Sequence, residues 1–177
     1  MFVALLRGIN VGGRNKVPMA DLRALAADLG WTNVFTYIAS GNLFFDAAAE
    51  AAAIETTLEG AIDRRFGITI PVIVRVTAQW PDLIAANPFP EAADAEPDRL
   101  MLCLTKAAPR DDAASKLEEH ARNGEQVRLA GGALWVYYPK GAGTSRLSPS
   151  LFDRLAGSPV TARNWRTVIK VGEFLMT

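Results

Sequence analysis

The sequence predicts an α+β protein built from two ferredoxin-like (split β-α-β) units in tandem. Short apolar strand patterns and amphipathic helix patterns follow the order strand, helix, strand, strand, helix, strand. The same order of elements recurs in the second half, and hydrophobic residues make up 50% of the 177-residue chain. We expect antiparallel sheets with helices on one face. The expected divisions are a first unit at 1–78, a linker at 79–98 and a second unit with a C-terminal helix at 99–177.

The first unit begins with an apolar strand and a helix that starts at Pro18 and stops at Gly30. A second helix stops at Gly67, because glycine favours the left-handed conformation that ends helices. The last strand contains Pro71, which favours an edge position. The expected strands of this unit cover 2–6, 33–38, 43–45 and 68–76.

The second unit follows a stretch rich in Pro and Ala, which we interpret as the linker. Gly131 and Gly132 predict a two-residue hairpin turn. The final strand has only Val160 and Thr161 before Asn164 begins a last helix. The strands expected here cover 100–104, 127–129, 134–138 and 160–161, with helices over 113–121 and 148–155.

Composition limits the classes of partner and compartment. Nineteen basic and nineteen acidic residues give zero formal net charge, which disfavours a protein that coats nucleic acid or anionic membrane. The one cysteine, Cys103, excludes a disulfide framework and a cysteine-based metal site. No signal peptide and no stretch of membrane-spanning length is found. We therefore expect a cytoplasmic protein with no membrane partner.

The segment between the first strand and first helix is the main candidate site. Its glycines leave backbone amides uncovered, and its basic residues lie beside a helix N-terminus, where anions are favoured. It matches neither the P-loop nor the dinucleotide-binding motif. A chain turn, with an arginine in a structural ion pair, explains the same residues. The candidates are Arg7, Gly8, Asn10, Gly12, Gly13, Asn15 and Lys16.

Topology brings further polar residues to the sheet edges. The first and second strands run in the same direction, so their carboxyl ends lie at one edge, and Ser40 and Asn42 join the first loop. Residues of this kind also serve hairpin turns. By the same reasoning, residues 139–146 lie near 161–167 in the second unit.

Three consecutive residues of the second unit are the remaining site candidates. Arg163 and Trp165 suit an anion clamp and a stacking platform. In the alternative reading, Asn164 caps a helix and Trp165 packs in the core.

The chain resembles bacterial proteins grouped as domain of unknown function 1697 (DUF1697) over nearly its whole length. The resemblance is based on Arg7-Gly8-Ile9-Asn10-Val11-Gly12-Gly13, Asn15-Lys16-Val17-Pro18-Met19, Thr36-Tyr37-Ile38 with Ser40-Gly41-Asn42, and Thr161-Ala162-Arg163-Asn164-Trp165-Arg166-Thr167. It implies two ferredoxin-like units and brings no established activity. Arg166 stands where family members carry asparagine, which would change the charge preference of a ligand site there.

The usual catalytic sets are missing from the sequence. Cys103 lies in an apolar run and His120 is the one histidine, so no nucleophile and base pair and no histidine metal site is expected. No cofactor is expected. Tyr137 and Tyr138 occupy adjacent strand positions, so one of them faces outward and is available to a site.

Three functions remain open at this point. The leading one is binding of a phosphate-bearing small molecule or nucleotide at the first loop, with nucleic acid possible but less favoured because of the neutral charge. The second is an enzyme acting on a phosphoryl or acyl substrate in a cleft between the units, with no general base identified. The third is an assembly protein without a ligand, and the oligomeric state is open.

Overall fold

A computed structural model of the protein describes residues 1–175 and contains two compact units, which begin at Met1 and at Trp80. Residues 80–98 of the expected linker at 79–98 fall within the second unit. They contain the short helices α3 (Trp80–Ala85) and α4 (Pro90–Ala95), after the 3-10 turn η1 (Thr77–Gln79). Residues 176 and 177, at the end of the second unit, lie outside the described residues.

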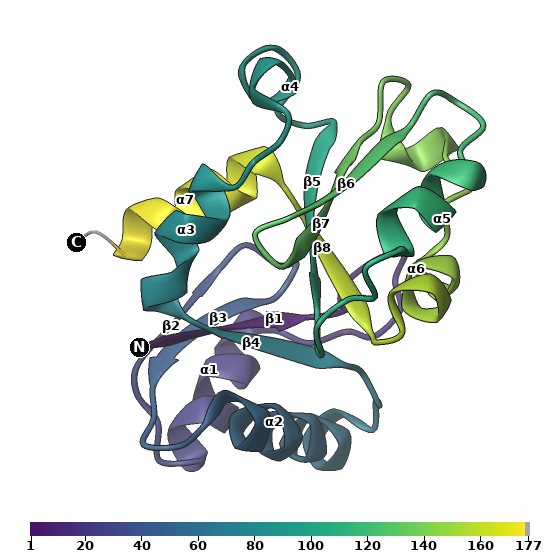
Figure 1. Cartoon of the computed structure of the whole chain (residues 1–177). Coiled ribbons are helices and arrows are strands. Elements are labelled where there is room, and N and C mark those ends of the chain that lie inside the picture. The colour runs from purple at the N-terminus through teal and green to yellow at the C-terminus, as the bar shows by residue number, and fades with distance from the viewer. Residues whose placement is uncertain (176–177) are drawn as a thin grey trace. The chain divides into compact units, whose positions relative to one another are not determined.

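The first unit is a four-stranded antiparallel sheet with two helices on one side (Figure 1). Its strand order β2-β3-β1-β4 is the one that the alternation of strands and helices predicts. The strand β4 lies at an edge, as Pro71 indicated. The elements are β1 (Phe2–Leu6), α1 (Met19–Asp28), β2 (Thr32–Tyr37), β3 (Asn42–Asp46), α2 (Ala51–Phe66) and β4 (Val72–Val76).

The core of the first unit is formed by apolar side chains of its helices and of one face of its sheet. Helix α2 buries Ile54, Leu58 and Ile62 at helical spacing. These side chains pack against alternate strand residues such as Leu6 and Phe45, both fully buried. The helices therefore cover one face of the sheet, and the loop after β1 emerges where that sheet ends.

The second unit repeats the strand order as β6-β7-β5-β8, which confirms the prediction of two similar units in tandem. Gly131 and Gly132 have φ of 58° and 72° and form the expected two-residue turn between β6 and β7. The elements are β5 (Leu100–Thr105), α5 (Ala113–Glu119), β6 (Gln126–Ala130), β7 (Ala133–Tyr137), the 3-10 turn η2 (Ala142–Thr144), α6 (Pro149–Ala156), β8 (Val160–Asn164) and α7 (Trp165–Leu175).

The last strand and last helix differ from the expectation. β8 extends to Asn164, because its pairing with β5 continues as far as Met101. The Trp165 ring lies 5.8 Å from that of Trp135, whose sequence neighbours face the α5 and α6 core. Helix α7 therefore adds a layer on the opposite face of the second sheet, where α3 packs against it through Trp80.

Candidate functional site

The loop after β1 folds into a small hairpin. The amide of Arg14 donates to the carbonyl of Val11 at 3.0 Å, and the amide of Asn10 donates to Asn15 at 3.1 Å. Gly12 and Gly13 at its tip have φ of 58° and 77°. A two-residue turn with both φ values positive requires such residues, so the glycines have a structural explanation.

Two asparagine side chains hold this hairpin in place. Asn10 Nδ2 donates to the carbonyl of Val17 at 2.9 Å, and Asn10 Oδ1 accepts from the amide of Val17 at 2.9 Å. Asn15 Nδ2 donates to the carbonyl of Gly8 at 3.0 Å. Both residues have positive φ, which asparagine tolerates better than most residues. Their amides thus fix the shape of the loop, a role that the sequence reasoning did not assign to them.

The turn between β2 and β3 meets the hairpin, as the topology predicted. Asn10 Nδ2 also donates to the carbonyl of Ala39 at 2.8 Å. The amide of Leu6 donates to Gly41 at 2.9 Å. Asn42 is fully buried, and its Nδ2 donates to the carbonyl of Tyr37 at 3.0 Å. The side-chain amide of Asn42 therefore bonds to the backbone of the turn itself.

Ser40 takes part in the same local network. Asn42 Nδ2 lies 3.4 Å from Ser40 Oγ, and Ser40 itself is half-buried. These contacts favour the turn-forming interpretation of Ser40 and Asn42 over direct ligand contact.

The outer surface of the hairpin is polar and basic. Arg14 and Lys16 are exposed, and Arg7 is half-buried. Open space surrounds the Cα atoms of Gly12 and Gly13. Within residues 1–175, no protein acceptor is found for the amides of these two glycines. The hairpin tip therefore presents free N–H groups next to an arm that carries two exposed cations.

Arg163, Asn164 and Trp165 have mainly structural partners in the second unit. The Arg163 guanidinium is 8% exposed and donates to Thr161 Oγ1 at 2.9 Å; burial lowers its pKa to about 10. Asn164 Oδ1 accepts from the amide of Thr167 at 2.9 Å and caps α7. Trp165 packs against Trp135. Exposed Arg166 forms an ion pair with Asp98, with 2.7 Å between Nε and Oδ1.

The carboxyl ends of β7 and β8 flank the segment that leads into β5. The amide of Tyr138 donates to the carbonyl of Arg99 at 2.9 Å, and the amide of Trp165 donates to that of Pro97 at 3.3 Å. The two predicted neighbouring segments are thus joined through residues 97–99. Sequence reasoning placed them at one edge without this intervening segment.

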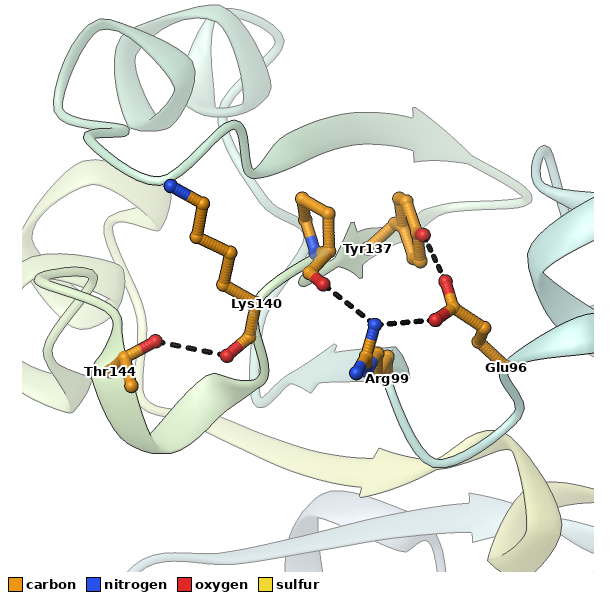
Figure 2. A network of polar contacts seen from close by, with 6 residues as sticks. Glu96, Arg99, Tyr137, Lys140 and Thr144 are labelled. Atoms are coloured by element: carbon orange, nitrogen blue, oxygen red, sulfur yellow. Dashed lines mark hydrogen bonds and ion pairs between the residues drawn. The ribbon is translucent and has the colours of Figure 1, made fainter.

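A polar network surrounds Arg99 at this edge (Figure 2). Arg99 Nη1 donates to Glu96 and, at 2.7 Å, to the carbonyl of Pro139. The Tyr137 hydroxyl donates to the other Glu96 oxygen, and this hydrogen bond raises the pKa of Tyr137. The Lys140 ammonium points away from the network in Figure 2. Tyr137 is the outward member of the tyrosine pair, since Tyr138 is 6% exposed and packs in the core.

A cavity of about 470 Å³ opens beside Tyr137 and Glu96, within the second unit. Sequence reasoning missed it, because α4 was read as part of a linker. The outward tyrosine at position 137 was the one available signal. The cavity is lined by Pro88, Phe89, Pro90, Glu91, Ala92, Ala95, Glu96, Gln126 and Tyr137.

Two further classes of site have no structural support. Among residues 1–175, no group of three or more His, Cys, Asp or Glu side chains is placed to hold a metal ion. Cys103 is 2% exposed, and burial raises the pKa of its thiol to about 12, which is unsuited to a nucleophile. Over the same part of the chain, each helix is too short or too polar to cross a membrane.

Comparisons with known proteins identify a family and a fold. The family model described as "Protein of unknown function (DUF1697)" matches residues 1–135. No curated protein matches the chain. A solved structure, that of the conserved bacterial protein SP0830 from Streptococcus pneumoniae, is similar with a TM-score of 0.71 and 23% identity, covering 98% of this chain and 97% of that one. This likeness supports the two-unit fold.

Proposed function

The chain belongs to the DUF1697 family of proteins of unknown function, and we propose that it binds a small phosphate-bearing ligand, such as a nucleotide, at the hairpin after β1. The carrying observation is the hairpin tip, where the free amides of Gly12 and Gly13 are followed along the chain by exposed Arg14 and Lys16. Consecutive backbone N–H groups in turns of this kind bind anions, and nearby cations strengthen such hydrogen bonds.

Rigidity of the loop supports the proposal. The Asn10 and Asn15 side chains fix the hairpin before any ligand arrives, so binding does not have to order it. Most of the candidates in the first loop and the β2–β3 turn then divide into two roles: Asn10, Asn15, Ser40 and Asn42 shape the loop, while Gly12, Gly13 and Lys16 contact the phosphate. Arg14, another of the basic residues of the loop, joins the second group.

The charge of the lining residues favours the loop after β1 over the cavity of the second unit as the phosphate site. The charged residues that line the cavity, Glu91 and Glu96, are acidic and would repel a phosphate. The zero net charge of the chain also disfavours a long nucleic acid, whose binding depends on many phosphate contacts. A single phosphate group on a small molecule fits a two-cation hairpin best.

The test is isothermal titration calorimetry with inorganic phosphate, AMP, ATP and a sugar phosphate at low ionic strength. We expect binding that weakens as salt rises and that falls at least tenfold in the Arg14→Ala/Lys16→Ala variant. The control is Lys140→Ala/Arg146→Ala, which removes two exposed cations from the second unit. An equal loss of affinity in both variants would show that binding depends only on the overall charge of the protein, which would contradict a site at the hairpin. An absence of binding by the wild type would refute the proposal.

A further inference from the structure

Three of the four edge strands in this protein carry the same kind of protection. The sheet orders make β2 and β4 the edges of the first sheet and β6 and β8 the edges of the second. Alternate residues of an antiparallel edge strand turn their N–H and C=O groups away from the sheet. Such groups pair with other chains unless they are covered.

On β4, carboxylates from α2 cover the outward amides. Val72 N donates to Glu59 Oε1 and Val74 N to Glu55 Oε1, both at 2.9 Å. The outward carbonyl of Val74 accepts from Arg75 Nη1 at 2.8 Å. Both kinds of backbone group along the middle of this edge are thereby satisfied.

The edge strand β6 uses the same arrangement. The amide of Val127 donates to Glu118 Oε1 of α5 at 3.0 Å. The carbonyl of Val127 accepts from Arg128 Nη1 at 2.8 Å. An acid from a helix and an arginine from the strand again cover one outward residue.

The edge strand β8 repeats it with a shorter acid. Val160 N donates to Asp153 Oδ1 of α6 at 2.9 Å, and the carbonyl of Ala162 accepts from Arg163 Nη1 at 2.8 Å. This gives Arg163 a backbone role in addition to its packing. The recurrence on three strands makes the protection a property of the fold.

The strand β2 lacks this protection. The amide of Leu6 donates to the carbonyl of Gly41 in the β2–β3 turn. From there, successive residues of β3 direct their backbone hydrogen bonds alternately to β2 and to β1. Phe35 and Tyr37 then join the β2–β3 ladder, and Val34 and Thr36 face outward. In the part of the chain that is described, no partner covers the backbone N–H or C=O groups of Val34 and Thr36.

Chemistry along β2 also differs from that of the other edges. The strand Thr32–Tyr37 contains no charged residue, whereas each of the other edge strands contains an arginine. A bulge between Thr32 and Phe35, with φ of 51° at Asn33, ends the regular edge on one side. The open edge is therefore short and limited to residues 34–37, and none of these four residues is charged.

We propose that a second copy of this chain pairs with β2 in antiparallel orientation across a two-fold axis at Phe35. Val34 of each copy then lies opposite Thr36 of the other, and each such pair exchanges two hydrogen bonds. The strand itself carries no charge, and the cation beside it is Arg23 of α1, whose Nη1 donates to Thr36 Oγ1 at 2.8 Å. The pairing is self-complementary, as a two-fold interface requires, and joins two first-unit sheets into one.

Partial protection of the other edges favours an assembly that stops at a dimer. Once β2 is paired, the remaining edges β4, β6 and β8 each present a carboxylate and an arginine that cover part of their outward backbone. A single short strand gives a small interface, so the dimer is expected to dissociate on dilution. The proposal is independent of phosphate binding at the hairpin after β1.

The first test is sedimentation velocity over a wide concentration range. We expect a reversible shift from monomer to dimer for the wild type. Thr36→Pro removes an outward N–H without removing a ladder bond, so it is expected to remain monomeric and folded. Ala162→Pro makes the same change at an exposed outward position of β8 and is expected to dimerise normally. A monomeric wild type, or a folded Thr36→Pro dimer, would overturn the proposal.

Disulfide trapping tests the axis without a proline. Across a two-fold axis at Phe35, the two residues 35 form a non-hydrogen-bonded pair with Cα atoms about 4.5 Å apart, within disulfide range. Phe35→Cys should therefore give a covalent dimer on mild oxidation, whereas Val34→Cys, which faces Thr36 of the other copy, should not. Buried Cys103 leaves the engineered thiol as the reactive one. A Phe35→Cys protein that stays monomeric would exclude pairing of β2 with a second copy. The same result is expected if a different protein binds this edge, so that outcome also overturns the proposal.

Discussion

The side chain of Asn10 joins the hairpin after β1, the start of α1 and the β2–β3 turn. It bonds both the amide and the carbonyl of Val17 and reaches the carbonyl of Ala39. Its φ of 56° places it in the left-handed region. Among residues that tolerate this backbone, asparagine adds a donor and an acceptor that glycine lacks. One residue therefore meets a backbone and a side-chain requirement together.

Substitution of Asn10 separates these two requirements. Asn10→Gly keeps the favoured backbone but removes the hydrogen bonds, and we expect it to lose about 1–3 kcal/mol of unfolding free energy. Asn10→Ala removes the same bonds and adds strain, so it should lose more. Urea unfolding followed by circular dichroism measures both. An Asn10→Gly protein as stable as the wild type would show that the side-chain bonds contribute nothing.

Glu125 is a buried carboxylate with a structural role in the second unit. It is 5% exposed, and its Oε2 accepts from the amides of Arg122 and Asn123 at 3.0 and 2.7 Å. Its Oε1 accepts from Ser145 Oγ at 2.5 Å. Burial by itself raises the pKa of Glu125, but the bonds from Ser145, Asn123 and Arg122 outweigh it and hold the pKa below its ordinary value.

The lowered pKa predicts how Glu125 contributes to stability as pH changes. A depressed folded-state pKa gives stability that is present above the unfolded value of about 4.3 and is lost as pH falls through the folded value. Glu125→Gln should therefore cost about 1.5–3 kcal/mol at pH 7 and progressively less in acid. Unfolding midpoints of both proteins from pH 7 to pH 3 test this. A constant difference across that range would contradict the charged role.

At the scale of elements, local signals predicted most boundaries correctly. Glycines ended α1, α2 and α6 at the expected places, with left-handed conformations at Gly67 and Gly157. The elements that sequence missed depend on distant partners. Trp80 of α3 donates to the carbonyl of Val168, 88 residues away, and no local pattern contains that contact. The Pro and Ala richness of residues 79–98 therefore gave no local signal for α3 and α4.

The candidate site shows the same division. Because topology fixes which strand ends share an edge, the meeting of the first loop with the β2–β3 turn was predictable, and the bond from Asn10 to Ala39 confirms it. The uses of the asparagine amides were not predictable, since a ligand and the protein backbone require the same donors. The cavity beside Tyr137 was missed because Glu96, its partner, lies 41 residues away in the assumed linker.

The contact between the β2–β3 turn and the first loop makes a prediction about Gly41. A Cβ there would lie 2.7 Å from Ile9 Cδ1 and 2.9 Å from Leu6 Cβ, at φ of 81°. Gly12, with φ of 58°, has nothing within 4 Å of the same position. Gly41→Ala should therefore destabilise the protein by more than Gly12→Ala, which carries backbone strain of about 1–2 kcal/mol alone.

Differential scanning calorimetry of the two alanine variants measures this difference. Both substitutions place a Cβ on a left-handed backbone, so the excess loss in Gly41→Ala reports the close packing of the turn on β1. Equal melting temperatures would mean that Leu6 and Ile9 move aside freely.

At the scale of the molecule, one strand order is used twice but the two units are not equivalent. Each sheet has two helices on one face, and the second unit adds α3, α4 and α7, with α7 on the opposite face of its sheet. The repeated order was predictable because apolar residues recur at a different spacing in strands than in helices, and this spacing is visible within short segments of sequence. The added helices were harder to assign, since their apolar residues pair with one another across the second unit, as Gly172 and Ile84 do.

Cys103 offers a probe of unfolding for the second unit. It lies on β5, the strand that pairs with both β7 and β8, and its register partners are Leu134 and Ala162. Burial raises the pKa of its thiol to about 12, so the reactive thiolate is scarce in the folded protein at pH 8. Reagent access requires the central strand to open.

We therefore expect a thiol reagent such as DTNB to leave the native protein essentially unlabelled at pH 8 and to modify one thiol per chain in denaturant. Ala162→Cys, at an exposed position on the neighbouring strand, is the control and should react rapidly in the native state. As urea is added below the transition, the labelling rate of Cys103 should rise with the slope of global unfolding, because opening of a central strand is governed by the full stability of its core. A native labelling rate near that of Ala162→Cys, or one independent of urea, would show that β5 opens locally.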